Sequence, residues 1–350
     1  MLTLWRALLV SAVTAGLLAP VGQASAADET GRPIPVIYDS DLDIDDAATL
    51  AYLCEQHKER RVDLRAVTVT DNGFGLPGRT RQHALSVLEQ CGLPGIPVAE
   101  GMNETAHKAP ADARQDVENV LTGALGDADR DPGPATVTAA QLIATTLSAT
   151  PGKITVLATG PLTNLARAVP PGSRQVSKVG ALHVMGGAVE VGGNLFGDAL
   201  PGFDNSQELN IWLDPVGARD LFAALPADVV HLTPLDATNH VPITPAYVDR
   251  LGADLTTPSA RIVHAIMTQP VMEAGIPMGW YYWWDAVAAL RAFDNDCVVT
   301  DVRTTGITVV QDGPQSGRTA ASADGNRLRV AYNADPVRFE QVFLDGLDGR

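Results

Sequence analysis

The sequence predicts an α/β fold with an open, mainly parallel sheet and helices on both faces. Short apolar runs rich in valine, isoleucine and leucine recur along the chain, a pattern typical of strands that are buried on both faces. An amphipathic stretch with helical spacing follows each of the first five runs, and this alternation favours parallel strand pairing. The 350 residues are 45% hydrophobic, enough to build a sizeable core, which excludes a disordered protein.

The elements follow in chain order. Strands are predicted at residues 34–38, 64–70, 154–158, 181–185 and 229–233. Helices are predicted at residues 46–56, 79–90, 138–148, 161–169 and 214–225. After Pro242 the pattern predicts helices at 259–273 and 284–293, small extra strands at 305–310 and 327–332, and a closing helix at 336–347. No repeat and no Ser/Pro-rich linker interrupts residues 27–350, so one domain is predicted there.

Residues 1–26 are predicted to be a signal peptide. Arg6 precedes an apolar stretch over residues 7–21, and Ala24, Ser25 and Ala26 provide the small residues that a signal peptidase cleaves after. The alternative is a membrane anchor, but polar and helix-breaking residues interrupt the stretch, which is short for a span of about 20 residues. The sequence therefore predicts a secreted protein that is not attached to a membrane once the signal is cleaved.

Composition excludes two further classes. With 25 lysines and arginines against 41 aspartates and glutamates, the net charge of −16 disfavours a nucleic-acid partner. The three cysteines, Cys54, Cys91 and Cys297, form no CxxC metal motif and permit at most one disulfide. Whether Cys54 pairs with Cys91 is left open.

A run of carboxylates follows the first predicted strand, at the edge where ligands bind in a parallel sheet. Its members are Asp39, Asp41, Asp43, Asp45 and Asp46. Partly buried carboxylates this close repel one another unless a cation binds or some stay protonated. Ligation by oxygen alone suits calcium or magnesium rather than zinc. The run therefore predicts a site for a hard divalent cation.

Three other interpretations of this run remain open at this point. An EF-hand loop requires glycine where Ile44 stands. A solvated acidic cap at a helix start needs no ligand at all. A phosphatase of the haloacid-dehalogenase type also begins with a strand and Asp-x-Asp, but it usually carries threonine or valine at the position of Asp43 and adds a lysine, and neither is evident here.

The chain carries an Asp-x-Asp pair, Asp39 and Asp41, followed after three residues by an Asp-Asp pair, Asp45 and Asp46. In this the chain resembles the calcium-dependent, inosine-uridine preferring nucleoside hydrolases, from Ile34 to about Leu344. The resemblance implies a Rossmann-like nucleoside hydrolase fold. It also implies that Asp41 is general base and calcium ligand, that Asp46 is a bidentate calcium ligand, and that Asp45 accepts a ribose hydroxyl.

Three later segments match the same family in order. Thr159, at a strand end, is implied to give its carbonyl to the calcium ion. Asn194, Glu208 and Asn210 are implied to bind the sugar; a probable extended segment would turn Glu208 and Asn210 toward one ligand. Asp285, after four aromatic residues, is implied to be the last protein ligand of calcium.

The chain also departs from the best-known branch of that family. Trp284 stands where that branch has a histidine that helps the base to leave, and the loop after the second strand differs, with Asn72 as its substrate-binding residue. Both features resemble the branch whose motif reads Trp-Asp. Of Trp280, Trp283 and Trp284, at least one is expected in the core. An aromatic residue in this stretch could stack on a purine, which predicts faster cleavage of purine nucleosides than of uridine.

The resemblance implies a secreted hydrolase that uses a calcium-bound water to cleave ribonucleosides into ribose and free base, in purine or pyrimidine salvage. The family is usually oligomeric, so a homo-oligomer is expected. Two alternatives are carried forward. One is a metal-dependent phosphohydrolase built on the same aspartate-rich strand end. The other is a secreted nucleoside- or sugar-binding protein without turnover.

Overall fold

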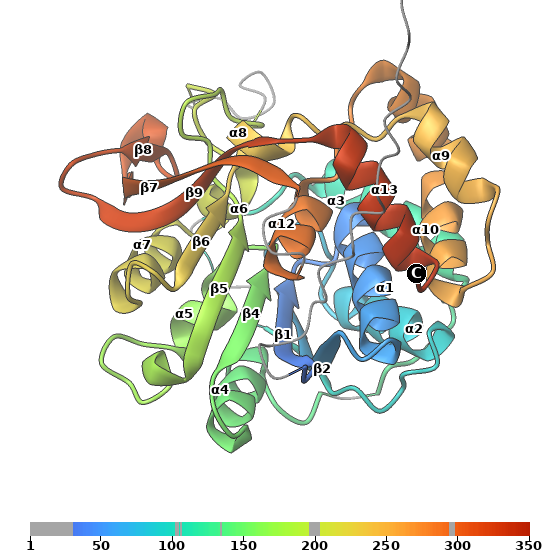
Figure 1. Ribbon diagram of the computed structural model, residues 1–350, viewed down its shortest axis with the longest axis horizontal. Coiled ribbons are helices and arrows are strands. Elements are labelled where there is room, and N and C mark those ends of the chain that lie inside the picture. Colours follow the sequence, from blue (N-terminus) through green and yellow to red (C-terminus); the bar gives the residue numbers. More distant parts are fainter. Residues whose placement is uncertain (1–30, 102–104, 106, 134, 196–203, 294–297) are drawn as a thin grey trace, which may run out of the picture.

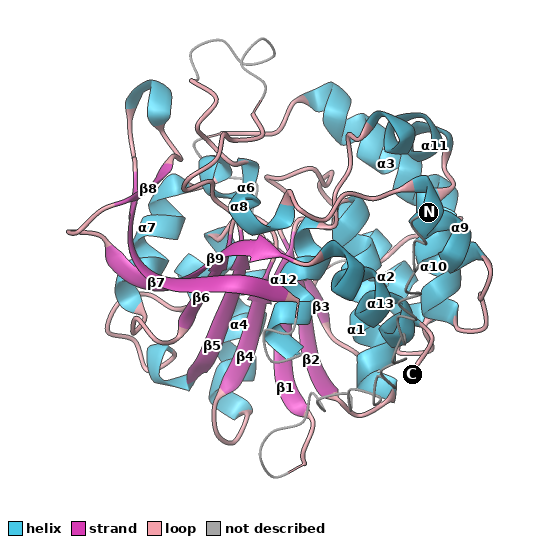
Figure 2. Cartoon of the chain, turned by 45° about the horizontal axis from the view of Figure 1, so that its top comes forward, coloured by secondary structure: helices cyan, strands magenta, loops and turns pink. Residues whose placement is uncertain are grey.

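A computed structural model describes residues 31–101, 105, 107–133, 135–195, 204–293 and 298–350. In these residues nine strands form one sheet in the order β3-β2-β1-β4-β5-β6-β9-β7-β8. Pairing is parallel from β3 to β9, and β7 pairs antiparallel with β9 and β8. Figure 2 shows the parallel strands β1, β2, β4 and β5 side by side. The predicted open, mainly parallel sheet is confirmed.

The strands are β1 (Ile34–Ser40), β2 (Val62–Val69), β3 (Val98–Glu100), β4 (Ile154–Ala158), β5 (Val179–Met185), β6 (Val230–Thr233), β7 (Val299–Val309), β8 (Thr319–Ala321) and β9 (Asn326–Ala334). The helices are α1 (Ile44–Lys58), α2 (Arg79–Gln90), α3 (Ala111–Leu125), α4 (Ala139–Ala149), α5 (Thr163–Ala168), α6 (Leu209–Leu213), α7 (Pro215–Ala224), α8 (Leu235–Thr238), α9 (Pro245–Gly252), α10 (Pro258–Met267), α11 (Pro270–Gly275), α12 (Trp284–Phe293) and α13 (Pro336–Leu347). Short 3₁₀ turns lie at Val176–Lys178, Ile276–Met278 and Gly313–Gln315.

Helices cover both faces of the sheet, as predicted. Alternate residues of a strand point to opposite faces, so in β1 Val36 and Tyr38 join one apolar cluster and Ile37 joins the other. The larger cluster packs α1, α2, α3, α10, α12 and α13 against the sheet, and the smaller one packs α4, α5 and α7. Figure 1 shows α1, α10 and α13 grouped beside the strands.

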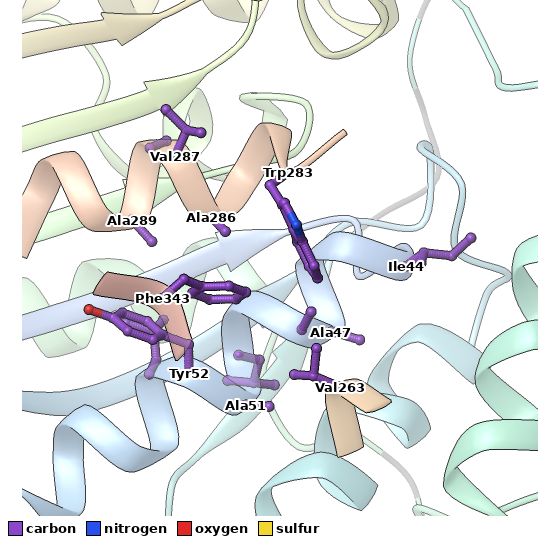
Figure 3. Close-up of a cluster of buried hydrophobic side chains, with 14 of the residues drawn as sticks. Ile44, Ala47, Ala51, Tyr52, Val263, Trp283, Ala286, Val287, Ala289 and Phe343 are labelled. Carbon is purple, nitrogen blue, oxygen red and sulfur yellow. The ribbon is translucent and has the colours of Figure 1, made fainter. Parts of the chain in front are cut away.

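The larger cluster also fixes the start of α12. Trp283, directly before that helix, is fully buried and packs edge-on against Phe343 of α13, with ring centroids 5.0 Å apart. Figure 3 shows its ring between α12 and α1, near Ala47. One tryptophan of the aromatic stretch is therefore core, as expected, and its packing holds the first turn of α12 against α1.

The structure corrects several sequence-based boundaries. The helix predicted over 259–273 is two helices, α10 and α11, because Pro270 has no N–H to continue the hydrogen-bond ladder. The helix predicted from Pro161 begins at Thr163. Strands β3 and β8 and helices α3 and α9 were not predicted.

The remaining predictions concern the cysteines, the signal peptide and membrane attachment. Cys54 and Cys91 are both buried and free. The predicted signal peptide and Cys297 lie outside the described residues. Across the part of the chain that the structure describes, no helix is long and apolar enough to cross a membrane.

Candidate active site

The acidic run lies between the end of β1 and the first turn of α1. After Ser40 the chain turns at Leu42, whose φ of 49° is uncommon for a residue with a side chain. Asp43 then caps α1: its Oδ1 accepts the N–H groups of Asp45 (3.1 Å) and Asp46 (3.2 Å), and Asp46 Oδ2 accepts the Asp43 N–H (3.0 Å). This capping box places the carboxylates at a helix N-terminus, where the helix dipole favours negative charge.

Asp46 connects α1 to the end of β4. The carboxylate is fully buried, and its Oδ1 accepts hydrogen bonds from the Tyr38 hydroxyl (2.8 Å) and from Thr159 Oγ1 (2.5 Å). Thr159 follows β4, and its own N–H donates to the Asp39 carbonyl at 2.9 Å. The structure thus brings Asp46 and Thr159 together.

Two loops pack closely on Asp41. This side chain is 2% exposed, and its Oδ2 accepts the Phe74 N–H at 2.6 Å. A Cβ atom at Gly160 would lie 2.5 Å from the Asp41 nitrogen, and one at Gly73 would overlap the Asp41 carboxylate. Only glycine fits at either position, so the loops after β2 and β4 hold Asp41 from two sides.

Asp285 reaches the acidic run from the far end of the sequence. As the second residue of α12 it donates its N–H to Asp45 Oδ2 at 2.9 Å. Asp43, Asp45 and Asp285 each present a carboxylate oxygen within 4.8 Å of the other two. These three side chains could hold a metal ion. The sequence analysis did not assign Asp43 as a ligand, although its place in the acidic run was the available signal.

We call Asp41, Asp43, Asp45, Asp46 and Asp285 the acid cluster. Burial, and then the charges of neighbouring cluster members, raise the pKa of Asp41, Asp45 and Asp285 well above the usual range, and the pKa of Asp43 to about 7. Among the described residues no lysine or arginine forms an ion pair with the cluster. A set of carboxylate oxygens without a compensating cation fits a hard divalent ion.

Asp39 serves the scaffold rather than the cluster. Its Oδ1 accepts Thr68 Oγ1 at 2.6 Å and Asn164 Nδ2 at 2.9 Å, so it links β1 to β2 and α5. Burial raises the pKa of Asp39 to about 7, against the effect of these two hydrogen bonds. Strand β1 ends at Ser40, between the two aspartates, so the carboxylates of Asp39 and Asp41 have different partners.

The prediction of an extended segment at Glu208 is wrong. Glu208 is the N-cap of α6, and its carboxylate accepts the backbone N–H groups of Asn210 (2.9 Å), Ile211 (3.1 Å) and Gly187 (2.8 Å). A carboxylate directly before the first residue of a helix competes well for the free N–H groups there, and this outweighs the alternation of a strand. Burial raises the pKa of Glu208, and the three backbone hydrogen bonds act in the opposite direction.

Asn210 and Asn194 lie on either side of this cap. Asn210 Nδ2 donates to the Thr159 carbonyl at 2.8 Å, which places α6 against the end of β4. That carbonyl oxygen keeps a second lone pair for a metal ion. Asn194 Oδ1 accepts the Leu209 N–H at 2.9 Å. Asn194, Glu208 and Asn210 are thus gathered around the start of α6, and Asn210 contacts Thr159.

Asn72 is fully buried in the loop after β2. Its Nδ2 donates to Thr163 Oγ1 at 3.2 Å, and Thr163 Oγ1 donates to Asp214 at 2.7 Å. The Oδ1 of Asn72 is buried without a hydrogen-bond partner. The structure therefore anchors Asn72 to the start of α5 and leaves one acceptor of its amide unused.

The aromatic residues before Asp285 divide into core and surface. Trp284 is half-buried; its Nε1 donates to Asn239 Oδ1 at 3.4 Å, and its ring centroid lies 5.4 Å from that of Tyr282. Trp280 is 60% exposed. Trp284 and Tyr282 thus keep part of their ring faces accessible beside the acid cluster.

Comparison with known proteins gives consistent relatives. The family model for inosine-uridine preferring nucleoside hydrolases matches residues 36–341. A probable uridine nucleosidase 2 of Oryza sativa subsp. japonica is 32% identical over 213 residues, 58% of this chain and 58% of that protein. Pyrimidine-specific ribonucleoside hydrolase RihA of Citrobacter koseri is 29% identical over 223 residues, 63% and 66% of the two chains. The matched region spans less than two thirds of either relative.

Solved structures share the fold. An inosine-uridine preferring nucleoside hydrolase from Bacillus anthracis superposes with a TM-score of 0.77 at 24% identity, over 91% of this chain and 100% of the other. A plant nucleoside hydrolase gives a TM-score of 0.74 at 24% identity, over 90% and 99%. The family match includes both α1 and α12, the two elements that carry the acid cluster. This chain therefore belongs to the inosine-uridine preferring nucleoside hydrolase family.

Proposed function

We propose that this protein is a calcium-dependent hydrolase that cleaves the N-glycosidic bond of ribonucleosides to give ribose and free base. The observation that carries the proposal is the acid cluster, in which buried carboxylates of α1 and α12 meet in a chain of this family. The two curated relatives described above are named for uridine or pyrimidine ribonucleosides, which supports a nucleoside as the substrate.

Four groups would hold the calcium ion: the carboxylates of Asp41, Asp46 and Asp285 and the carbonyl of Thr159. All four offer oxygen, the ligand atom that calcium takes. Asp43 and Asp45 add negative charge beside them. A bound calcium ion would orient the attacking water and make its proton easier to remove.

Asp41 acts as the general base in this proposal. It takes a proton from the attacking water while the ribose develops positive charge at the anomeric carbon. The Phe74 N–H holds Oδ2 of Asp41, so the carboxylate presents its other oxygen in a fixed direction. Fixing a catalytic group in this way lowers the entropic part of the barrier.

Asp45, Asn72, Asn194, Glu208 and Asn210 bind the ribose in this proposal. Hydrogen bonds to backbone or side-chain groups already hold each of them in place. Such a site orders few side chains when it binds the sugar. A site built to bind a hydroxyl rejects a substrate that lacks it by about 10⁴-fold or more, so 2'-deoxyinosine should be a far poorer substrate than inosine.

Departure of the base is assigned to the neighbourhood of Trp284. Its half-buried ring beside Asp285 can stack on the leaving base. Stacking there favours a purine, whereas the names of the relatives support uridine. Rates on inosine, adenosine and uridine separate these two preferences.

The cellular setting belongs to the same proposal. The composition of residues 1–26 supports secretion after cleavage of a signal peptide. Residues 27–350 would then form the mature enzyme, which we propose to be a homo-oligomer. N-terminal sequencing of protein recovered from the medium, together with its mass in solution, tests both points.

Release of base from uridine, inosine and adenosine by the purified protein tests the activity, with the Asp41→Asn variant as control. We expect free base and reducing sugar in equal amounts from the wild type and at least about 10³-fold less from the variant, in line with the loss of an essential base. Release of phosphate from a phosphomonoester, with no base released, would indicate the phosphohydrolase. Binding of inosine in calorimetry without any product would indicate a binding protein.

A further inference from the structure

The loop that holds Asp41 has no regular secondary structure of its own. It spans residues 70–76, between β2 and α2. Glycines are needed at two of its positions because of close approach: a Cβ at Gly73 would overlap the Asp41 carboxylate, and one at Gly75 would lie 2.7 Å from the Asp41 carbonyl. A glycine-rich loop costs more entropy to order than other sequences. Something outside the loop must therefore hold it in place.

Arg114 makes that contact. It lies in the first turn and a half of α3, and its Nη2 donates to the Asp71 carbonyl at 2.9 Å and, by a shorter contact, to the Gly75 carbonyl. The two carbonyls lie on either side of Phe74, whose N–H donates to Asp41. One guanidinium group therefore joins the two ends of the segment that presents the donor to Asp41.

Arg114 occupies a position in α3 where an apolar side chain would be expected. The buried residues of α3 are Arg114, Val117, Val120, Leu121 and Leu125, which form one core-facing stripe at helical spacing. Arg114 is 8% exposed and occupies a place in that stripe where an apolar residue would pack without loss of hydration. A buried guanidinium at such a place is explained by what it binds.

The middle of α3 is also fixed. Glu118 and Thr122 accept hydrogen bonds from Arg79 of α2, at 2.6 Å and 2.8 Å. Helix α3 is thus tied to α2 at its middle while Arg114 reaches the loop from its beginning. A rigid helix is a suitable support for a group that must hold a loop to within a fraction of an ångström.

We propose that Arg114 is a positioning residue for the hydrolysis. It holds the segment between Asp71 and Gly75 so that the Phe74 N–H fixes the direction of the Asp41 carboxylate. The inference rests on the proposed role of Asp41 as general base. It assigns Arg114 to the chemical step rather than to substrate affinity, since it touches the backbone of the loop and neither the acid cluster nor the sugar-binding residues by hydrogen bond.

The test compares Arg114→Met and Arg114→Lys with a matched control, Arg81→Met. Arg81 of α2 likewise donates to two backbone carbonyls of one loop, those of Pro132 (3.1 Å) and Gly133 (2.9 Å), but no hydrogen bond joins the described residues of that loop to Asp41. For Arg114→Met we expect kcat to fall about 30- to 100-fold with KM changed less than about threefold, the size expected for a misplacement of about 1 Å. Arg114→Lys, which can reach one carbonyl, should recover part of kcat. Arg81→Met should keep kcat within about twofold.

Hydrogen exchange gives a readout that does not depend on activity. Amides of residues 70–76 should exchange faster in Arg114→Met than in wild type and unchanged in Arg81→Met. Wild-type kcat in Arg114→Met, a rise in KM with kcat unchanged, or unchanged exchange in this loop would each overturn the inference. If Arg114→Met does not fold, Arg114→Lys decides the question by the same measurements. A wild type that releases no base from any ribonucleoside would contradict the proposed function instead, and exchange would still report whether Arg114 holds the loop.

Discussion

Two regions of this molecule bury several carboxylates, and they treat them in opposite ways. One is the acid cluster at the starts of α1 and α12. The other, which we call the α2–α3 clasp, consists of Arg79 and His83 from α2, Glu118 from α3 and Asp127, which follows α3. In the cluster the pKa values of Asp41, Asp43, Asp45 and Asp285 are raised, whereas in the clasp those of Glu118 and Asp127 are lowered.

The cause of the difference is the presence of cations. In the clasp His83 Nδ1 lies 2.9 Å from Asp127 Oδ2 and His83 Nε2 lies 3.0 Å from Glu118 Oε2, while Arg79 Nε donates to Glu118 at 2.6 Å. Burial pushes the pKa of both carboxylates upward, but hydrogen bonds from His83 and the neighbouring positive charges outweigh it. In the cluster, burial and mutual repulsion dominate: Arg114 acts on Asp41 through its charge, but no described lysine or arginine forms an ion pair with the cluster.

The two regions differ in whether the protein itself supplies positively charged partners for the carboxylates. In the clasp Arg79 and His83 compensate the negative charges, so the carboxylates serve to fix α3 against α2. The cluster is incomplete, and a cation from outside would relieve its repulsion. Buried carboxylates therefore indicate a metal site only where no positively charged side chain of the protein pairs with them.

The largest expected effect comes from removing one carboxylate from each region. Asp285→Asn should lower kcat/KM on ribonucleosides by at least about 10³-fold, because it removes a calcium ligand. It should leave the metal-free protein as stable as wild type or more so, because one repelling charge is gone. Asp127→Asn should do the reverse and reduce stability while the active site keeps its chemistry. Steady-state rates and chemical unfolding of both variants carry the comparison, and a loss of stability in metal-free Asp285→Asn would break it.

Metal removal should act on the acid cluster alone. A ligand that binds only the folded state at about 1,000 times its dissociation constant adds about 4 kcal/mol to the free energy of unfolding. Chelator-treated protein should therefore unfold at a lower temperature, lose base release, and recover both with calcium. The calcium-induced shift should persist in Asp127→Asn and disappear in Asp285→Asn. An equal shift in both variants would place the calcium site elsewhere.

His83→Gln tests the clasp. Glutamine can keep one hydrogen bond but brings no charge, so Glu118 and Asp127 lose their shared partner inside the protein. Breaking a buried ion pair by removing one partner costs about 3–5 kcal/mol, and the retained hydrogen bond reduces this to about 2–4 kcal/mol. The free energy of unfolding from urea titration measures the change. A loss below about 0.5 kcal/mol would show that the clasp is not what fixes α3.

The smallest expected effect is the pH dependence of that difference. Burial lowers the pKa of His83, but hydrogen bonds to Asp127 and Glu118 and their charges raise it above its usual value. A group with a raised folded-state pKa stabilises the protein below its unfolded-state pKa, about 6.5, and this contribution is lost as pH rises through the folded-state pKa. Glu118 and Asp127, with lowered pKa values, contribute above about pH 4 and lose their contribution on acidification. The stability gap between wild type and His83→Gln should therefore be widest between about pH 5 and pH 6.5 and narrow above it. A gap that widens above pH 8 would mean that His83 is neutral in the folded protein.

Much of the fold follows from local patterns in the sequence. The run Ile154–Ala158 is apolar on both faces except at Thr155, a pattern that indicates a buried strand. Helix α3 was not predicted because the first position of its core-facing stripe is Arg114. A charged residue there makes the apolar pattern incomplete. Strand β3 has three residues and gives too short a pattern to detect.

The candidate site was predictable where its residues are close in sequence and less so elsewhere. The acidic run predicted a cation site after the first strand, and Asp43 and Asp45 of this run lie close to Asp285. Glu208 was misplaced in an extended segment because a helix of five residues shows no helical period, and the cap depends on the Gly187 N–H from a distant loop. Arg114 and Tyr38 carried no signal, because the partners of Arg114 lie 43 and 39 positions away and Thr159, the partner of Tyr38, lies 121 positions away.

The distance along the chain between the two halves of the acid cluster has a consequence for biosynthesis. Asp45 and Asp285 are 240 residues apart in sequence, yet they meet through a single hydrogen bond. A nascent chain that has released only its first half carries α1 without its partner and has no complete set of ligands. In the proposed calcium site, uptake of the ion would require that α12 has left the ribosome and packed on α1, so it would report that these two helices have met.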